Sequence, residues 1–344
     1  MTPTPSELDL RTAYAGGVFF FSPENLLSHN SGCLIEGLLD LGIKVRANTA
    51  DFTSRGASWP LVGVDTKALV SKPFAGLSAF VVDITHTNSY VPLDSVRGGR
   101  IAYVTNSDMS LFCRVPEPYA LFAVHDTRFA KKPGRRFPLA FGPSNGLIAA
   151  SEKRLPFAQR KRVALRNFRP SFGQGVRGLL DMACLPHLKN AITCDSAIQE
   201  TAPYLDALCS STVCLAYGGE FYNSMRTNTW LAEKDPNMFA YHTFEHFDGE
   251  AIVMRWDSWR FWESLVCGCL TVHLDFVKYG FNLPVMPKPW VHYAPIDLDD
   301  LKGSADALMD REKQWPEIAE AGRCWAIEHY APKPTVLRVL GQML

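Results

Sequence analysis

A basic and an acidic side chain, Arg260 and Glu263, stand three positions apart within residues 255–272. The pattern of this segment predicts a loop, a helix, a turn at Gly268 and a buried strand. Arginine and the first amide groups of a helix both bind anions, so the segment suits the diphosphate of a nucleotide. Glu263 can accept hydrogen bonds from ribose hydroxyls. The alternative interpretation is an ion pair on a helix surface.

Short polar residues mark the expected start of the same helix. Asp257 or Ser258 would cap it, and Gly268 would let the backbone turn tightly into the next strand. We therefore include Ser258 and Gly268 among the expected donor-binding residues. The tryptophans of the segment are expected to pack in the core rather than stack on a base or sugar. They are Trp256, Trp259 and Trp262.

This segment resembles the donor-binding segment of GT-B glycosyltransferases, in particular their exostosin-like and group 1-like branches. Those enzymes share a pattern R-x-x-E-x-x-x-x-G-C that leads into a strand, and Arg260, Glu263, Gly268 and Cys269 match it. The resemblance implies a metal-independent transferase that moves a hexose or pentose from a nucleotide-sugar donor to an acceptor hydroxyl. The nucleotide sugar would be a substrate, so neither a cofactor nor a metal is expected.

The end of the chain resembles the same enzymes. Residues 325–332, followed by a short helix, are similar to their last segment, in which the final helix crosses back to the first domain. The resemblance covers residues 251–340 and is only architectural over residues 1–160.

The resemblance implies further donor-binding residues. Asn167 and Arg169 lie in the loop after the first strand of the second half, and in GT-B enzymes that loop often touches the donor phosphates. An arginine there can neutralise the leaving diphosphate without a metal; a solvated loop is the alternative. Residues 289–293 are similar to a family segment near the base and sugar, which makes Tyr293 and Asp297 candidates.

Short apolar runs alternate with helical spacings, which is typical of open parallel α/β sheets. In the first half, strands are expected at 17–22, 44–48, 79–83, 100–104, 119–124 and 138–141. In the second half they are expected at 163–166, 191–194, 212–216, 251–254 and 270–274. Helices are expected at 30–41, 175–185, 258–267, 298–311, 315–329 and 334–342.

A charged stretch at 151–162 predicts a linker between the halves. We expect an α/β protein with two Rossmann-like domains facing across a cleft, the GT-B arrangement. An N-terminal acceptor domain would span residues 1–155, a C-terminal nucleotide-sugar donor domain residues 156–330, and a helix at 331–344 would return to the first domain. Parallel sheets bind ligands beyond the carboxyl ends of their strands, and domain interfaces often hold pockets.

A transferase that inverts configuration needs a general base for the acceptor hydroxyl. The candidates for this role stand at the ends of expected strands of the first half, and we rank His86 and His29 above the others, Asp83 and His125. Packing or capping is the alternative role for each. A retaining enzyme would not need a base there.

Motifs of other enzyme classes carry little support. Residues 242–246 match the H-x-x-E-H zinc pattern, but Asp248 and Gly249 cut the segment short and no third ligand stands out, so we reject a metalloprotease. The D-x-D sequence at 297–299 precedes an expected helix, where acidic caps are favoured, so we assign it no metal. The chain lacks a P-loop, so an ATPase has little support.

The composition fits a folded protein, because 47% of the 344 residues are hydrophobic and 20% are charged. Lys and Arg number 35, as do Asp and Glu, which argues against binding nucleic acid through bulk charge. No apolar run reaches the ~18 residues of a membrane helix. The polar start and the odd count of nine cysteines indicate a reducing, cytoplasmic compartment.

The acceptor and two rival functions stay open. The acceptor could be a glycan, a small molecule or a modified nucleic acid. One rival is a non-catalytic nucleotide-sugar-binding protein on the same scaffold, and the other is a glycosyltransferase acting on modified DNA bases. A local basic strip would serve the latter. It would consist of Lys131, Lys132, Arg135, Arg136, Arg160, Lys161 and Arg162.

Overall fold

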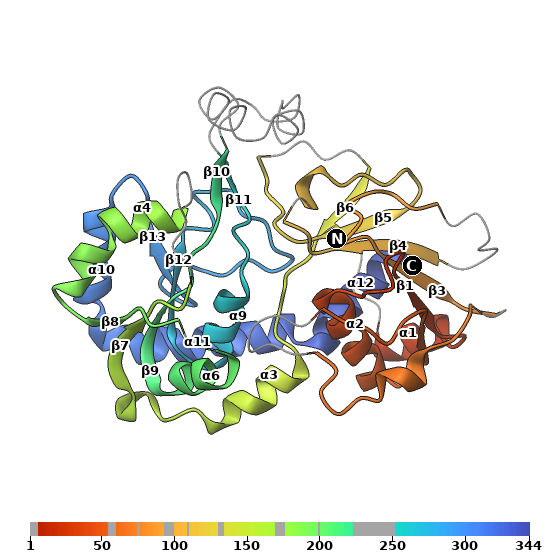
Figure 1. Ribbon diagram of the computed structural model, residues 1–344, viewed down its shortest axis with the longest axis horizontal. Helices are drawn as coiled ribbons and strands as arrows, with labels where there is room; N and C mark the ends of the chain where they lie inside the picture. The colour runs from red at the N-terminus through yellow and green to blue at the C-terminus, as the bar shows by residue number, and fades with distance from the viewer. Residues whose placement is uncertain are drawn as a thin grey trace. The chain divides into compact units, whose positions relative to one another are not determined.

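The computed structural model describes most of the chain, which divides into two compact units that Figure 1 traces. The described residues are 6–53, 60–73, 76–92, 100–108, 110–129, 134–168, 176–198, 200–222 and 252–344. Unit 1 consists of Met1–Val124, Pro133–Glu152 and Cys324–Leu344. Unit 2 consists of His125–Lys132 and Lys153–Arg323. Within the described ranges, no helix is both long and apolar enough to cross a bilayer.

Unit 1 is built on a 6-stranded sheet of order β2-β1-β3-β4-β5-β6 in which every neighbouring pair is parallel. The strands are β1 (Val18–Phe21), β2 (Val45–Ala47), β3 (Ala79–Asp83), β4 (Arg100–Thr105), β5 (Ala120–Ala123) and β6 (Arg135–Pro138). The first five lie where the sequence predicts strands. A parallel α/β sheet in the first half is therefore confirmed.

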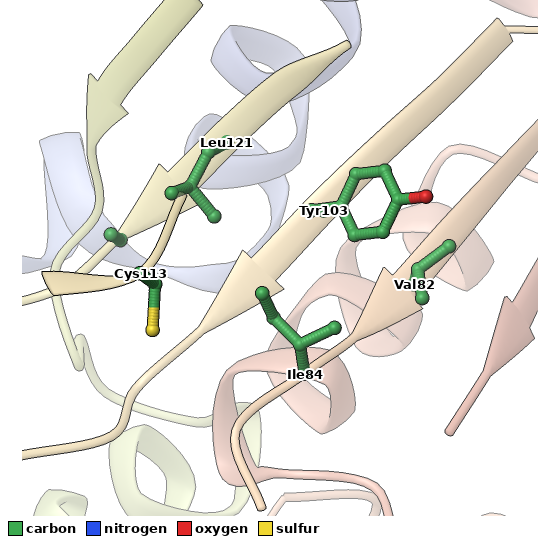
Figure 2. Packing of buried hydrophobic residues seen from close by; sticks show 6 residues of the cluster. Val82, Ile84, Tyr103, Cys113 and Leu121 are labelled. Carbon is green, nitrogen blue, oxygen red and sulfur yellow. The ribbon is translucent and has the colours of Figure 1, made fainter. Parts of the chain in front are cut away.

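Apolar side chains from three adjacent strands form a buried cluster in this unit (Figure 2). Val82, Tyr103 and Leu121 are in register on β3, β4 and β5, so their side chains point to the same face of the sheet. Ile84 and Cys113 complete the layer. The Tyr103 hydroxyl donates a hydrogen bond of 2.8 Å to a backbone carbonyl, which satisfies the polar end of a ring in an apolar setting.

The C-terminal helix belongs to unit 1. The helices of this unit are α1 (Glu7–Ala13), α2 (His29–Asp40), α3 (Asn145–Ala150) and α12 (Pro332–Met343). A Cβ added at Gly37 of α2 would lie 2.3 Å from the Pro332 carbonyl oxygen, so glycine permits the close approach of α2 and α12. The Tyr14 hydroxyl donates to the carbonyl of Leu340 at 2.9 Å. The predicted return of the last helix to the first domain is confirmed.

Unit 2 holds a second parallel sheet, of 5 strands in the order β13-β12-β9-β7-β8. Its strands are β7 (Lys161–Leu165), β8 (Thr193–Asp195), β9 (Ser211–Leu215), β12 (Leu270–Leu274) and β13 (Ala294–Ile296). Its helices are α4 (Val176–Ala183), α5 (Leu185–Lys189), α6 (Thr201–Ser210), α9 (Trp259–Val266), α10 (Leu301–Asp310) and most of α11 (Trp315–Tyr330). The predicted fold class, two Rossmann-like α/β units, is confirmed.

Two expected strands differ from the structure. The run 138–141 is not the last strand of unit 1, because β6 forms from the charged residues just before it. An edge strand tolerates such residues, since one side of it has no partner strand. The strand expected at 251–254 appears as β11 (Ile252–Met254), which pairs antiparallel with β10 (Glu220–Tyr222) rather than joining the parallel sheet.

A short segment after β5 docks on unit 2, which the sequence did not predict. Thr127 pairs with Phe281 in an antiparallel bridge, and the Arg128 amide donates to the Gly280 carbonyl at 2.8 Å. The indole of Trp256 donates to the Asp126 carbonyl at 3.1 Å. These contacts explain why residues 125–132 belong to unit 2 although unit 1 precedes and follows them.

Candidate donor site

The carboxyl ends of the parallel strands of unit 2 gather the loops that could hold a ligand. Arg166 follows β7 directly, and residues 216–219 follow β9. Helices that return from the carboxyl edge of such a sheet begin at that edge, which places the first turns of α4 and α9 there. Two hydrogen bonds fix these turns. The Val176 amide donates to Gly219 at 3.1 Å, and the Ser258 hydroxyl donates to Ala216 at 3.0 Å.

The side chain of Ser258, the N-cap residue of α9, does not cap the helix. Ser258 occupies the N-cap position, as predicted. Its hydroxyl donates a hydrogen bond to the Ala216 carbonyl instead of accepting one from the helix amides. The Asp257 carboxylate accepts the indole N–H of Trp262 at 2.7 Å, and the Asp257 amide donates to His125 Nδ1 at 3.2 Å. The expected capping bond of the Ser258 side chain is therefore wrong. The first amides of α9 lie at the positive end of the helix, which attracts anions.

Three guanidinium groups surround the ring of Phe168. The guanidinium carbons of Arg166, Arg177 and Arg260 lie 4.3, 5.1 and 5.7 Å from the ring centroid. Arg260 also donates from Nε to the Asn167 carbonyl at 2.6 Å. Phe168 is buried, so the ring supports the three cations from the protein side.

One carboxylate partner balances part of this charge. Arg166 donates from Nε to Asp181 at 2.6 Å and makes a second, shorter contact from its terminal nitrogen. The hydrogen bond to Asp181 raises the pKa of Arg166, against the effect of burial. The three guanidinium groups therefore gather positive charge at the carboxyl edge of unit 2, next to the α9 N-terminus.

Glu263 lies inside unit 2, with 1% of its surface exposed. It is close to Tyr204 on α6 and Cys214 on β9. Burial raises the pKa of Cys214 to about 12; Arg260 lowers this pKa and Glu263 raises it. Burial also raises the pKa of Tyr204, and the same two charges act on it. The two motif residues thus share an environment, Arg260 half-buried at the edge and Glu263 deeper.

Gly268 lies away from this edge, whereas the hydroxyl of Tyr293 reaches the carboxyl end of β12. Gly268 ends α9 with a φ of +72°, a left-handed conformation that glycine adopts without strain, so its predicted role in the turn is confirmed. Because α9 separates it from Ser258, it lies at the opposite end of that helix. Tyr293 is fully buried, and its hydroxyl accepts from the Phe276 amide at 3.0 Å. Their contact with a donor stays a prediction.

The loop residues predicted after β7 are only partly described. Asn167 is half-buried, and its backbone carbonyl accepts a hydrogen bond from Arg260. Arg169 lies outside the described residues, as does the H-x-x-E-H sequence at 242–246. Asp297 and Asp299 both pair with Lys278, which accounts for the D-x-D sequence.

The candidate bases belong to unit 1 and sit in different settings. The Asp83 carboxylate accepts the Ser28 amide and the Ser31 hydroxyl, each at 2.6 Å, and the Thr85 amide at 3.1 Å. It therefore anchors the start of α2. His29, also at that start, is buried, with Nε2 3.2 Å from the sulfur of Cys33. His86 is exposed in the loop after β3. The base role stays a prediction for all three residues.

Sequence reasoning did not select Arg166, Arg177 and Asp181. Arg166 could have been found, because a charged residue directly after a buried strand lies at the ligand edge of a parallel sheet. Arg177 carried no such signal. Its place beside Phe168 depends on how α4 packs, and the nearest group to a Cβ built on Gly218 is an Arg177 nitrogen, at 3.3 Å.

No family model matches this chain, and no curated protein matches it. Solved structures do. An alpha-glucosyltransferase in complex with UDP is 10% identical, with a TM-score of 0.48, over 91% of this chain and 95% of that one. AviGT4, a glycosyltransferase involved in avilamycin A biosynthesis, is 10% identical, with a TM-score of 0.49, over 95% and 96%. Both belong to the class that the sequence resembles. Since the TM-scores are below 0.5, the proposals below rest on this chain's own residues.

Proposed function

We propose that this chain is a GT-B-type glycosyltransferase that binds a nucleotide-sugar donor at the carboxyl edge of the unit 2 sheet. The observation that carries the proposal is the cluster of Arg166, Arg177 and Arg260 on Phe168, beside the start of α9. A diphosphate would meet three fixed cations and the first amides of a helix, all held in place before it binds.

This cluster acts on the step in which the sugar leaves the nucleotide. Negative charge grows on the departing diphosphate as the glycosidic bond breaks, and fixed cations stabilise that charge more than they stabilise the intact donor. The half-buried Arg260 is positioned for this role. Glu263 would accept a hydrogen bond from a ribose hydroxyl, one helical turn further into the protein.

The acceptor would bind through unit 1. If the enzyme inverts configuration, Asp83, His29 or His86 would take the proton of the attacking hydroxyl. Asp83 accepts two hydrogen bonds on Oδ2 and one on Oδ1, so an acceptor hydroxyl would approach Oδ1. His29 and His86 are the alternatives, because an imidazole nitrogen can accept a proton.

The proposal is tested with a panel of UDP-, GDP-, CMP- and dTDP-sugars, each incubated with the protein while nucleotide release is followed by chromatography. We expect one donor to be bound and slowly hydrolysed. Arg260→Ala should weaken donor binding by roughly 10- to 100-fold, because a charged hydrogen bond contributes about 1.5–3 kcal/mol. Arg162→Ala is the matched control, since Arg162 pairs with Glu312 near the amino end of β7. Equal donor affinities in the two variants would refute the phosphate assignment.

A non-catalytic nucleotide-sugar-binding protein is the second candidate. The three hydrogen bonds of Asp83 favour it, because they give this carboxylate a structural role at the start of α2. The same panel separates the two functions. A binding protein would take up one donor, lose it in Arg260→Ala and release no nucleotide on any timescale of the assay.

A further inference from the structure

Two buried thiols meet at the amino edge of the unit 2 sheet, opposite the candidate donor site. Cys209 lies in the last turn of α6, which leads directly into β9, and Cys267 is the C-cap of α9, which leads into β12. Cys209 is 4% exposed and Cys267 is fully buried. Both strands begin at this edge, so the two helix ends come together there.

Hydrogen bonds hold the two chain segments side by side. One nitrogen of Arg160 donates to the Gly268 carbonyl at 2.6 Å and to the Ser211 carbonyl at 3.4 Å. The Cys269 thiol donates to the Leu208 carbonyl at 3.1 Å. The residues that flank Cys209 and Cys267 in the sequence are therefore held together, which brings the two helix ends close to each other.

The thiols differ in chemistry. The Cys267 thiol donates a hydrogen bond to the Cys209 sulfur, which lowers the pKa of Cys209, and Lys153 and Arg160 lower it further. The same hydrogen bond raises the pKa of Cys267, which keeps its proton. A thiolate-prone sulfur in contact with a second thiol is the arrangement in which an oxidised cysteine is resolved as a disulfide.

We propose that Cys209 and Cys267 form a reversible disulfide when the protein meets hydrogen peroxide. The Cys209 thiolate attacks one peroxide oxygen, so an S–O bond forms, the O–O bond breaks and the leaving hydroxide takes up a proton to become water. The Cys267 sulfur then attacks the Cys209 sulfur. The S–S bond forms, the S–O bond breaks, and the leaving hydroxide takes the Cys267 proton. Both sulfurs are oxidised, and one peroxide is reduced to two waters.

The disulfide would tie the end of α6 to the end of α9. The latter helix carries Arg260 and Glu263, so the link would act on the helix of the candidate donor site from its far end. Formation of this disulfide does not depend on whether the protein transfers a sugar.

The test treats the folded protein with hydrogen peroxide, removes the oxidant, denatures the protein and counts free thiols. All comparisons use the Cys324→Ser background, because Cys324 is exposed and would oxidise on its own. We expect a loss of two thiols per chain, recovered with dithiothreitol, and a chain that stays monomeric on a non-reducing gel. Cys209→Ser and Cys267→Ser should each abolish that loss.

Cys269→Ser is the matched control, since Cys269 is equally buried and adjoins the same helix end. It should still lose two thiols. Thermal melts of the three variants show whether each one folds, and mass spectrometry of the folded Cys324→Ser protein gives the linkage without relying on them. The proposal is overturned if no disulfide forms, if the link joins other cysteines, or if peroxide produces only a sulfinic acid at Cys209.

Discussion

The ring of Phe168 is in contact with three arginine side chains. A buried ring with three guanidinium groups within 6 Å of its centroid is a rigid platform for cations, and one of them, Arg166, also pairs with Asp181. The sequence identified Arg260 because its spacing to Glu263 matches a pattern. It could not show the platform, because Arg166, Arg177 and Arg260 come from three separate segments and meet only after β7, α4 and α9 pack.

The ion pair beneath this platform should matter for stability. Asp181→Asn leaves the Arg166 guanidinium without its charged partner in a place where the two side chains are only 9% and 19% exposed. We expect the free energy of unfolding to fall by about 3 kcal/mol. Glu312→Gln is the control, since it breaks an exposed pair with Arg162 that contributes less than about 1 kcal/mol. Chemical denaturation measures both, and similar small losses would contradict the prediction.

Glu36 should give unit 1 a pH-dependent stability. Its carboxylate accepts the amides of Leu61 at 2.6 Å and Asn145 at 2.9 Å. Burial raises the pKa of Glu36 to about 7, although these two hydrogen bonds lower it. The folded state therefore holds the proton more tightly, and the free energy of unfolding should fall as pH rises from 4.5 to about 7.

Glu36→Gln removes this titration. Denaturation curves over that pH range should show that the free energy of unfolding falls with rising pH in the parent protein and changes less in the variant. The difference between the two proteins at each pH gives the contribution of Glu36. Parallel curves would mean that the carboxyl does not titrate in this window.

Helices and strands were the part of the fold most open to prediction. The strands at 79–83 and 270–274 were predicted with the bounds that β3 and β12 have, because each is a short apolar run buried on both faces. Elements with weaker patterns were missed. β13 contains Pro295, and α5 and α6 each contain a proline in the first turn. The apolar residues of these segments therefore show neither a clear strand period nor a clear helical period. The segment 125–132 was missed because no local pattern shows which sheet a crossing segment joins.

The glycine that ends α9 should be less replaceable than its counterpart in unit 1. Gly42 and Gly268 each lie between a helix and the next strand. Both have a positive φ, +69° at Gly42 and +72° at Gly268. A Cβ on Gly42 would meet nothing within 4 Å, whereas one on Gly268 would lie 3.0 Å from an Arg160 nitrogen. Gly42→Ala should cost roughly 1 kcal/mol for the backbone alone. Gly268→Ala should cost roughly 2 kcal/mol or more by chemical denaturation, because Arg160 must also shift. Equal costs would show that Arg160 moves freely.

Over the whole chain, the last residues stabilise the first unit. The helix α12 packs on α2, and its residue Leu340 is 1% exposed. The sequence predicted this return only through resemblance, because the amphipathic pattern of the last helix does not reveal which surface it covers. The arrangement of the donor site could likewise be predicted only as a helix start with a basic and an acidic residue.

Leu340→Ala should therefore destabilise unit 1. Truncating a fully buried leucine costs about 2–5 kcal/mol. Leu344→Ala is the control, because Leu344 is 52% exposed and its truncation should change stability by less than about 0.5 kcal/mol. Hydrogen exchange of β4 and β5 in the two variants gives the local effect. Unchanged protection of these strands in Leu340→Ala would contradict a stabilising role of α12.

The most direct test of a nucleotide-sugar site in unit 2 is hydrogen exchange with and without UDP, GDP, dTDP and CMP. One of these ligands should slow exchange in the first turn of α9, in residues 216–219 after β9 and in the first turn of α4. Arg260→Ala should lose that protection while Arg162→Ala keeps it. Protection confined to unit 1, or none with any of the four nucleotides, would contradict the assignment of the donor site.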